Sequence, residues 1–334
     1  MKKILCILFL LSTLTSRADE GMWIPMLLGQ STYDDMVKKG LKLSSEDIYN
    51  INQASLKDAI VLFGGGCTAE VISEQGLLIT NHHCGYGEIQ SHSTVEKDYL
   101  LNGFWAMSKE EELPNDDLTV SFLIRMEDVS KTVLENVKDD MSEADRDKVI
   151  QEAIKKIEKE AVKGTHYEAR VRPFYYGSEY YLFVMETFSD VRLVGAPPTS
   201  IGSFGGDTDN WVWPRHTGDF SMFRIYADKD NKPAKYSKDN VPYKPKKSLT
   251  ISLKGVKKGD FTMVYGFPGR TQEYLTSWAV DLIANTDNPI KVSLRTKRLE
   301  IMGRGMNISR KVKLQYASKY NGVANAWKKW DGEM

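Results

Sequence analysis

The residues best suited to chemistry stand together in the pentapeptide Thr80-Asn81-His82-His83-Cys84. An apolar run directly before it predicts a strand, so the two imidazoles are expected at a strand end. Imidazole titrates near neutral pH and can serve as a general base if its ring is held in place, because misplacing a reacting group costs rate steeply. His83, next to Cys84, is the candidate base, and His82 is its flanking residue. The alternative is that both histidines only fill the end of the strand.

Two of the three cysteines, Cys67 and Cys84, lie outside the N-terminal apolar segment. That segment predicts export, and an exported protein with two cysteines favours one disulfide. The bond would close a loop of about 17 residues and, in the chain-entropy model, stabilise the fold by roughly 3 kcal/mol. Chymotrypsin-like proteases also fix their base beside a disulfide. A zinc site of Cys67, His83, Cys84 and His92 is the rival, but these spacings fit no usual ligand pattern, and no metal is expected.

A second concentration of reactive side chains lies between Asp207 and Phe220. It contains two tryptophans, an amide, a guanidinium and Asp219, which opens a predicted strand. A carboxylate that orients a catalytic histidine must be buried and hydrogen-bonded to the second ring nitrogen. Asp219 is the candidate for that role. Asp207 and Asp209 compete with it, and turn formation is the alternative for all three.

Short β-branched runs separated by glycine turns must position these two motifs. After a leading helix, the runs lie at residues 59–63, 69–73, 77–80, 169–172, 180–185, 190–194, 220–226, 248–253 and 261–265. Such punctuation is typical of an antiparallel barrel or sandwich, so the chain is predicted to be mainly β with α.

Two segments have helical patterns instead. Residues 130–164 are charged and amphipathic. Their one apolar face is formed by Ile150, Ile154, Ile157 and Val162. Residues 271–334 have few turn signals and predict the start of a helical domain. We therefore expect a β domain at 19–270, with a helical excursion, and a second, truncated helical domain at 271–334.

The N-terminus has the anatomy of a secretory signal. Met1-Lys2-Lys3 is followed by an apolar run and then by small residues up to Ala18. The apolar run is too short for a membrane span, which needs about 20 residues. Residues 1–18 are thus predicted to be a signal peptide, with a mature chain from Asp19 in the periplasm or outside the cell, including attachment to the cell surface.

Composition restricts the function classes further. The 334 residues include 45 basic and 45 acidic side chains, and 41% of residues are hydrophobic. Zero net charge argues against nucleic acid or an anionic membrane surface as the main partner, because both demand a basic field. The function must therefore be sought in a local site.

Several longer blocks of the sequence are distinctive: Phe63 to Thr68, Thr80 to Gln90, Glu111 to Pro114, Val191 to Pro198 and Asn210 to Asp219. Together they resemble one family, the bacterial periplasmic serine dipeptidyl-peptidases. The resemblance extends from about Gly21 to Trp330. It implies a chymotrypsin-like double β-barrel, incomplete here, with the start of an inserted α-helical domain. It also implies removal of dipeptides from peptides with a free N-terminus, without metal or organic cofactor, and allows a homodimer.

The resemblance assigns roles to individual residues. It implies the base His83, its orienting partner Asp219, the disulfide Cys67–Cys84, and a substrate N-terminus anchor made of Asn210, Trp211, Arg215 and Asn325. An ammonium group has three donors and a charge, so amide oxygens and an aromatic face suit it. Anchoring that group at a fixed distance from the cleaved bond would fix the length of the released product at two residues. The neighbouring Trp213 is expected to be a core aromatic.

The family's nucleophilic segment, of the type Gly-Asn-Ser-Gly-Ser-Pro, has no match in this sequence. Ser203 in the glycine-rich stretch before Asp207 is a superficial substitute, but it falls between base and acid in chain order and is not expected to attack. We therefore expect an N-terminal part that is inactive alone. Asn102 to Met107 and Arg224 to Asp228 are closer to the family branch that cleaves after Asp or Glu. A catalytically inactive peptide-binding or surface module is the alternative function.

Overall fold

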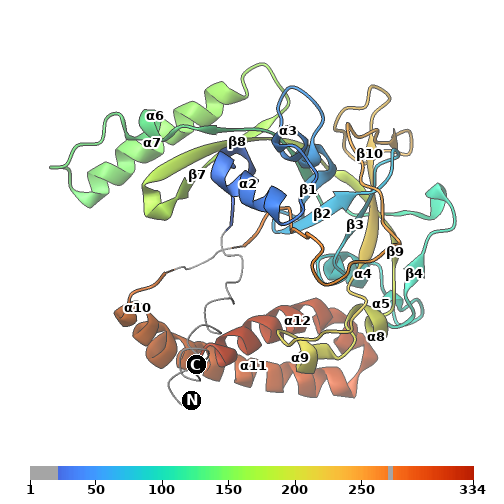
Figure 1. Ribbon diagram of the computed structural model, residues 1–334. Coiled ribbons are helices and arrows are strands. Elements are labelled where there is room, and N and C mark those ends of the chain that lie inside the picture. The colour runs from blue at the N-terminus through green and yellow to red at the C-terminus, as the bar shows by residue number, and fades with distance from the viewer. Residues whose placement is uncertain (1–21, 270–273) are drawn as a thin grey trace, which may run out of the picture.

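A computed structural model describes residues 22–269 and 274–334 of the chain. Figure 1 shows an antiparallel sheet with short helices around it, and beneath it a pair of long helices at the C-terminal end of the chain. The predicted signal peptide lies outside the described residues. The predicted domain boundary also falls there, at residues 270–273, and stays a prediction. None of the described helices is both long and apolar enough to cross a membrane.

Within the described residues, eleven strands form one sheet in which every pair is antiparallel. The strands are β1 Ile60–Phe63, β2 Cys67–Val71, β3 Leu77–Thr80, β4 Phe104–Trp105, β5 Leu113–Pro114, β6 Val120–Asp128, β7 Glu168–Phe174, β8 Glu179–Phe188, β9 Asp190–Ala196, β10 Ser221–Ala227 and β11 Val241–Pro242. The order is β4-β9-β10-β3-β2-β1-β6-β8-β7, with β5 and β11 attached at the side. Among the described strands, β4 and β7 do not pair, so the sheet stays open, as the prediction of an incomplete barrel requires.

Local sequence explains the centre of this sheet. Gly64 and Gly65 join β1 to β2 with φ values of 56° and 73°, a region that glycine enters without steric cost. In β1, β2 and β3, large apolar side chains such as Phe63, Val71 and Leu78 are fully buried in one core. Burial of that face sets the register, because a slip of one residue would turn the apolar set toward water.

The helices are mostly short, and the last three of them lie beneath the sheet (Figure 1). They are α2 Gln30–Lys38, α3 Ser45–Ile48, α4 Tyr86–Ser91, α5 Tyr99–Asn102, α6 Ser130–Leu134, α7 Glu143–Ala161, α8 Thr199–Gly202, α9 Gly206–Asp209, α10 Ser277–Leu282, α11 Asn288–Ile308 and α12 Arg310–Gly332. A π-helical turn, Ile283–Asp287, joins α10 to α11.

Helix α7 occupies the predicted helical excursion and covers the end of the sheet at β7 and β8 (Figure 1). Ile150 and Ile154 are buried in a second core against β7 and β8, and Ile157 and Val162 pack at its edge. The predicted apolar face of residues 130–164 is therefore confirmed.

Helices α11 and α12 pack side by side, and α12 also contacts the sheet body (Figure 1). Arg310 forms an ion pair with the buried carboxylate of Asp98, which caps α5. Farther along α12, the backbone N–H of Ser318 donates to Oε1 of Gln90 on α4 at 2.6 Å. These contacts bring α12 next to the region that follows β3.

Two predicted strands, residues 248–253 and 261–265, are wrong, because both segments are irregular in the structure. Leu249 donates one backbone hydrogen bond to Val71, but no ladder develops within the described residues. Leu253 and Val264 are 97% and 102% exposed, so these apolar side chains lie on no sheet face. A β-branched run becomes a strand only where a neighbouring strand pairs with it.

Candidate active site

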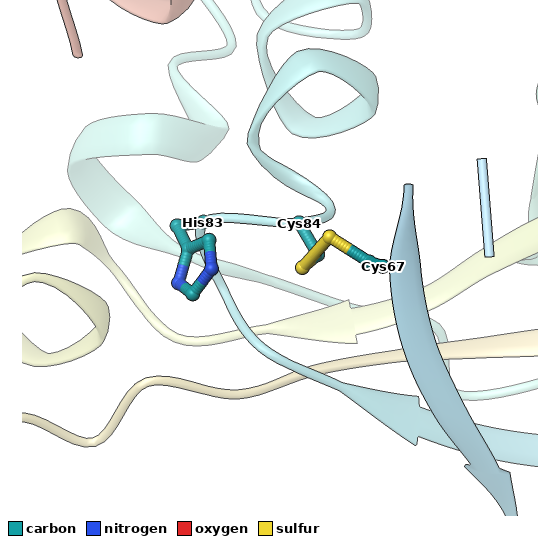
Figure 2. Close-up of side chains that lie close together, drawn as sticks. All are labelled: Cys67, His83 and Cys84. Atoms are coloured by element: carbon teal, nitrogen blue, oxygen red, sulfur yellow. A yellow bond between two sulfur atoms is a disulfide. The ribbon is translucent and has the colours of Figure 1, made fainter. Parts of the chain in front are cut away.

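The disulfide predicted from the sequence is present. Figure 2 shows the ring of His83 next to the bond between Cys67 and Cys84. Cys67 begins β2, and Cys84 follows the end of β3, with a Cα–Cα distance of 6.2 Å, which suits a disulfide. The two sulfurs and a ring nitrogen of His83 lie within 4.8 Å of one another. Because the sulfurs are bonded to each other, they provide no thiolate for a metal.

Strand pairing brings the two sequence motifs together. Strands β3 and β10 are antiparallel, with Thr80 opposite Ser221. Residues directly after β3 therefore meet residues directly before β10 at one edge of the sheet. His83 and Asp219 occupy these positions, and the Nδ1 atom of His83 lies 2.8 Å from Oδ2 of Asp219. The predicted contact between the two side chains is thus present.

Asp219 is half-buried and accepts hydrogen bonds from more than the ring. Its Oδ1 accepts from the backbone N–H of His83 at 3.0 Å, and its Oδ2 accepts from Nδ2 of Asn81 at 3.3 Å. Burial alone would raise the pKa of Asp219, but the hydrogen bonds from His83 and the charges of His83 and Arg215 outweigh it and lower that pKa. Asp219 is therefore an anion at neutral pH.

An ionised Asp219 determines the tautomer of His83. The carboxylate can only accept, so Nδ1 of the ring carries the proton and Nε2 keeps its lone pair. The side chain of His83 is 66% exposed. Among residues 22–269 and 274–334, no hydroxyl forms a hydrogen bond with this ring, and that includes Ser203 at the end of α8. The pair can thus take a proton from a group that approaches Nε2.

Asn81 is a functional candidate that the sequence reasoning missed. Its amide donates to both the side chain and the backbone carbonyl of Asp219, at 3.3 Å each. It therefore helps to aim the carboxylate at His83. A possible signal was its position one residue before the histidines at the end of β3, although a single polar residue there predicts no partner by itself.

The four residues expected to anchor a substrate N-terminus lie together, and we call them the amine clamp: Asn210, Trp211, Arg215 and Asn325. Nδ2 of Asn210 donates to Oδ1 of Asn325 at 2.8 Å. Nε1 of Trp211 donates to the backbone carbonyl of Asn325 at 3.2 Å. Arg215 donates to Oδ1 of Asn210 at 3.3 Å. Because Asn325 belongs to α12, the clamp joins the helical pair to the loop between α9 and β10.

Residues 201–218 carry Asn210, Trp211 and Arg215, and we call this segment the clamp loop; its backbone is unusual at Trp211. Trp211 has φ of 60°, in the left-handed region that a bulky side chain rarely adopts, so its hydrogen bond to α12 must help to hold it. Trp213 is 90% exposed, and the prediction that it is a core aromatic is wrong. The cause is the loop's position over the surface, where Trp213 has no core beneath it.

Comparison with known proteins identifies the relatives of this chain. The sequence model of a family described as Peptidase S46 matches residues 18–334. The chain is 57% identical over 313 residues to the Asp/Glu-specific dipeptidyl-peptidase of Capnocytophaga gingivalis, covering 94% of this chain and 44% of that protein. It is 54% identical over 331 residues to the Asp/Glu-specific dipeptidyl-peptidase of Flavobacterium psychrophilum, covering 99% of this chain and 46% of that protein.

A solved structure is similar over most of this chain. The crystal structure of Porphyromonas endodontalis DPP11 in complex with the dipeptide Arg-Asp matches with a TM-score of 0.88 and 43% identity, covering 94% of this chain and 46% of that one. The chain therefore spans a little less than half the length of the relatives that it matches.

Proposed function

The chain belongs to the peptidase S46 family, and from this membership we propose that the whole protein is a serine-type dipeptidyl-peptidase. The observation that carries the proposal is the 2.8 Å contact between Nδ1 of His83 and Oδ2 of Asp219. It gives an oriented base with a free Nε2 lone pair. The neighbouring amine clamp would bind the N-terminal ammonium of a peptide, so the proposed enzyme would act on peptide N-termini.

The proposed reaction is acyl transfer. A serine supplied by the protein outside these 334 residues loses its proton to Nε2 of His83 and attacks the carbonyl of the second residue of the peptide. The imidazolium returns that proton to the leaving amine. Water, deprotonated by the same ring, then hydrolyses the acyl-dipeptide, while Asp219 holds Nδ1–H throughout and stabilises the charged ring. No step needs a metal or an organic cofactor.

The clamp would set the length of the product. Oxygen atoms of Asn210 and Asn325 can accept from a substrate ammonium, and the ring of Trp211 can face its charge. Arg215 keeps the Asn210 amide oriented through its hydrogen bond to Oδ1. In this proposal, a charged terminus held at one place would leave room for two residues between the clamp and the base, so the product would be a dipeptide.

We propose that the residue before the cleaved bond is Asp or Glu. Two relatives of 54% and 57% identity are named Asp/Glu-specific dipeptidyl-peptidases. The similar structure from Porphyromonas endodontalis contains the dipeptide Arg-Asp, which ends in an acidic residue. Acidic peptides with a free N-terminus are therefore the proposed substrates.

Export and self-association complete the proposal. The Cys67–Cys84 disulfide supports an oxidising compartment, the periplasm or the outside of the cell, with cell-surface attachment included. A homodimer stays a prediction from the family resemblance, and nucleic acid is not proposed as a partner.

A matched pair of substrates tests the function. Full-length enzyme is assayed with a fluorogenic dipeptide that has Asp at its second position, with its amine either free or acetylated. Acetylation removes the charge that the clamp would bind, and losing a charge-assisted hydrogen bond costs about 1.5 to 3 kcal/mol, or roughly ten- to a hundredfold in kcat/KM. Equal rates on the two substrates would refute the clamp's role, and no turnover of either would refute the peptidase itself.

A further inference from the structure

His82, the neighbour of the proposed base, is completely buried. Neither of its ring nitrogens forms a hydrogen bond to any residue that the structure describes. The backbone carbonyl of Pro197 lies near the ring and raises the pKa of His82, but its geometry falls short of a regular hydrogen bond. A buried polar side chain without partners costs free energy. Such a residue is expected to have a function that an aliphatic filler would not require.

The ring of His82 packs directly on a glycine. A Cβ atom added to Gly202, the last residue of α8, would lie 2.3 Å from Cδ2 of His82, which is closer than any real contact. On another side, the rings of His82 and Tyr86 meet edge to face at 5.5 Å. His82 therefore fills the space between the strand end that carries the base and the backbone of α8.

Helix α8 begins the loop that carries the clamp. The backbone carbonyl of Ile201 accepts from the N–H of Gly218 at 2.9 Å and from the hydroxyl of Thr217 at 3.1 Å. These bonds close residues 201–218 into a loop whose two ends lie together. Asn210 and Trp211 lie within this loop, and Asp219 is the first residue after it. Whatever holds Gly202 also holds the clamp loop relative to His83.

We propose that His82 is a positioning residue, whose ring sets the position of the clamp loop relative to the base by packing against Gly202. The proposal rests on the proposed peptidase function and extends it. His82 touches no substrate and shares no proton with the reaction. Its effect is to keep the bound N-terminus at the correct distance from His83, and it should therefore act on kcat more than on KM, because the side chains that bind the N-terminus are unchanged.

The electrostatics of the site agree with a neutral ring. Burial lowers the pKa of His82, Asp219 and the Pro197 carbonyl act in the opposite direction, and His83 lowers it further. The other titratable group against the ring, Tyr86, stays neutral because burial raises its pKa. A histidine held neutral in the fold binds fewer protons than the same residue released, so the packed state loses stability as pH falls below about 6.5.

The contact can be tested by a rescue experiment in the full-length enzyme. Gly202→Ala places a methyl group where the ring lies, whereas His82→Ala combined with Gly202→Ala removes the ring that it meets. Gly87→Ala on α4 is the matched control, since its added Cβ would meet only Ser318 Oγ at 4.0 Å. Rates are divided by the concentration of active sites, which is titrated with a serine-reactive phosphonate, so that loss of folded protein does not count.

We expect Gly202→Ala to lower kcat by about a hundredfold, the cost of misplacing reacting groups by about 1 Å, with KM changed less than about threefold. The double variant should recover at least about tenfold of that loss, and Gly87→Ala should match the wild type. A normal kcat in Gly202→Ala, or a double variant no better than the single one, would overturn the proposal.

Hydrogen exchange of residues 199–218 provides a readout that does not depend on activity. In the wild type, protection of this segment, corrected for intrinsic exchange, should fall between about pH 7 and pH 5, and in His82→Leu that dependence should disappear. Identical pH dependence in both proteins would refute the role of His82. If the wild type released no dipeptides, the proposed function would fail, and the exchange data would still decide whether His82 holds the loop.

Discussion

Replacing Asp219 with asparagine tests the proposed catalytic pair without changing its shape. The carboxylate accepts from three donors: the ring Nδ1 of His83, the backbone N–H of His83 and the amide of Asn81. An asparagine amide offers only one acceptor oxygen, so its NH₂ group must face a donor in either orientation. The backbone N–H cannot give up its proton, whereas the ring can move its proton to Nε2. The structure thus predicts that the ring adopts the tautomer in which Nε2 is occupied.

A ring with its proton on Nε2 cannot deprotonate a serine. In proteases with this arrangement the same exchange lowers kcat about ten-thousandfold, which corresponds to about 5 kcal/mol of transition-state stabilisation. We expect a loss of that order for Asp219→Asn, with the fold intact, because the side-chain volume is unchanged. Steady-state kinetics of the full-length enzyme on a free dipeptidyl substrate measures the loss, with active-site titration to correct for inactive protein.

The control is Asp209→Asn, which removes a competing carboxylate of the same segment. Because Asp209 has no hydrogen bond to His83, its substitution should leave kcat within a few fold of the wild type. The reasoning would be refuted if Asp219→Asn kept more than about a tenth of the activity, or if the Asp209 variant were the inactive one.

Three further outcomes follow from named contacts. Changing both Cys67 and Cys84 to serine should lower the free energy of unfolding by about 3 kcal/mol, measured by chemical denaturation, and equal stability would contradict the constraint on the loop. Asn325→Ala should raise KM for free-amine substrates about tenfold or more in steady-state kinetics, and an unchanged KM would count against the clamp. Arg224→Met leaves the carboxylate of buried Glu112 without its guanidinium partner and should cost about 3 to 5 kcal/mol of stability in the same denaturation assay, where a loss below about 1 kcal/mol would show the pair to be dispensable.

Most of the sheet could be predicted because its signals are local. Glycine turns and β-branched runs near Phe63 and Leu78 predict the strands there to within a few residues of their bounds. Short turns between these strands also predict that neighbours along the chain pair as hairpins. Residues 248–253 carry the same kind of pattern but no pairing partner among the described strands. Whether these residues form a strand depends on pairing with residues far away in the sequence, and a local pattern carries no information about such pairing.

The candidate site divides in the same way. The requirement for a carboxylate beside a catalytic histidine made Asp219 a candidate together with Asp207 and Asp209, and the family resemblance singled out Asp219. The pairing of β3 with β10, which brings Asp219 to His83, is visible only in the structure. The members of the clamp came from family resemblance, because no spacing links Asn210 to Asn325 on a distant helix. The contact of His82 with Gly202 had no sequence signal at all, since close packing of a ring on a backbone depends on the three-dimensional fold. The catalytic roles themselves stay predictions.

The products formed from one synthetic peptide test the central claim, that an oriented histidine base works beside a clamp for a free N-terminus. The full-length enzyme is incubated with a peptide that has Asp at its second and sixth positions, and early products are identified by mass spectrometry. Release of the N-terminal dipeptide, with the bond after the sixth residue intact, is the predicted result. Early cleavage after the sixth residue would contradict it, because a base coupled to the clamp should reach only the second peptide bond.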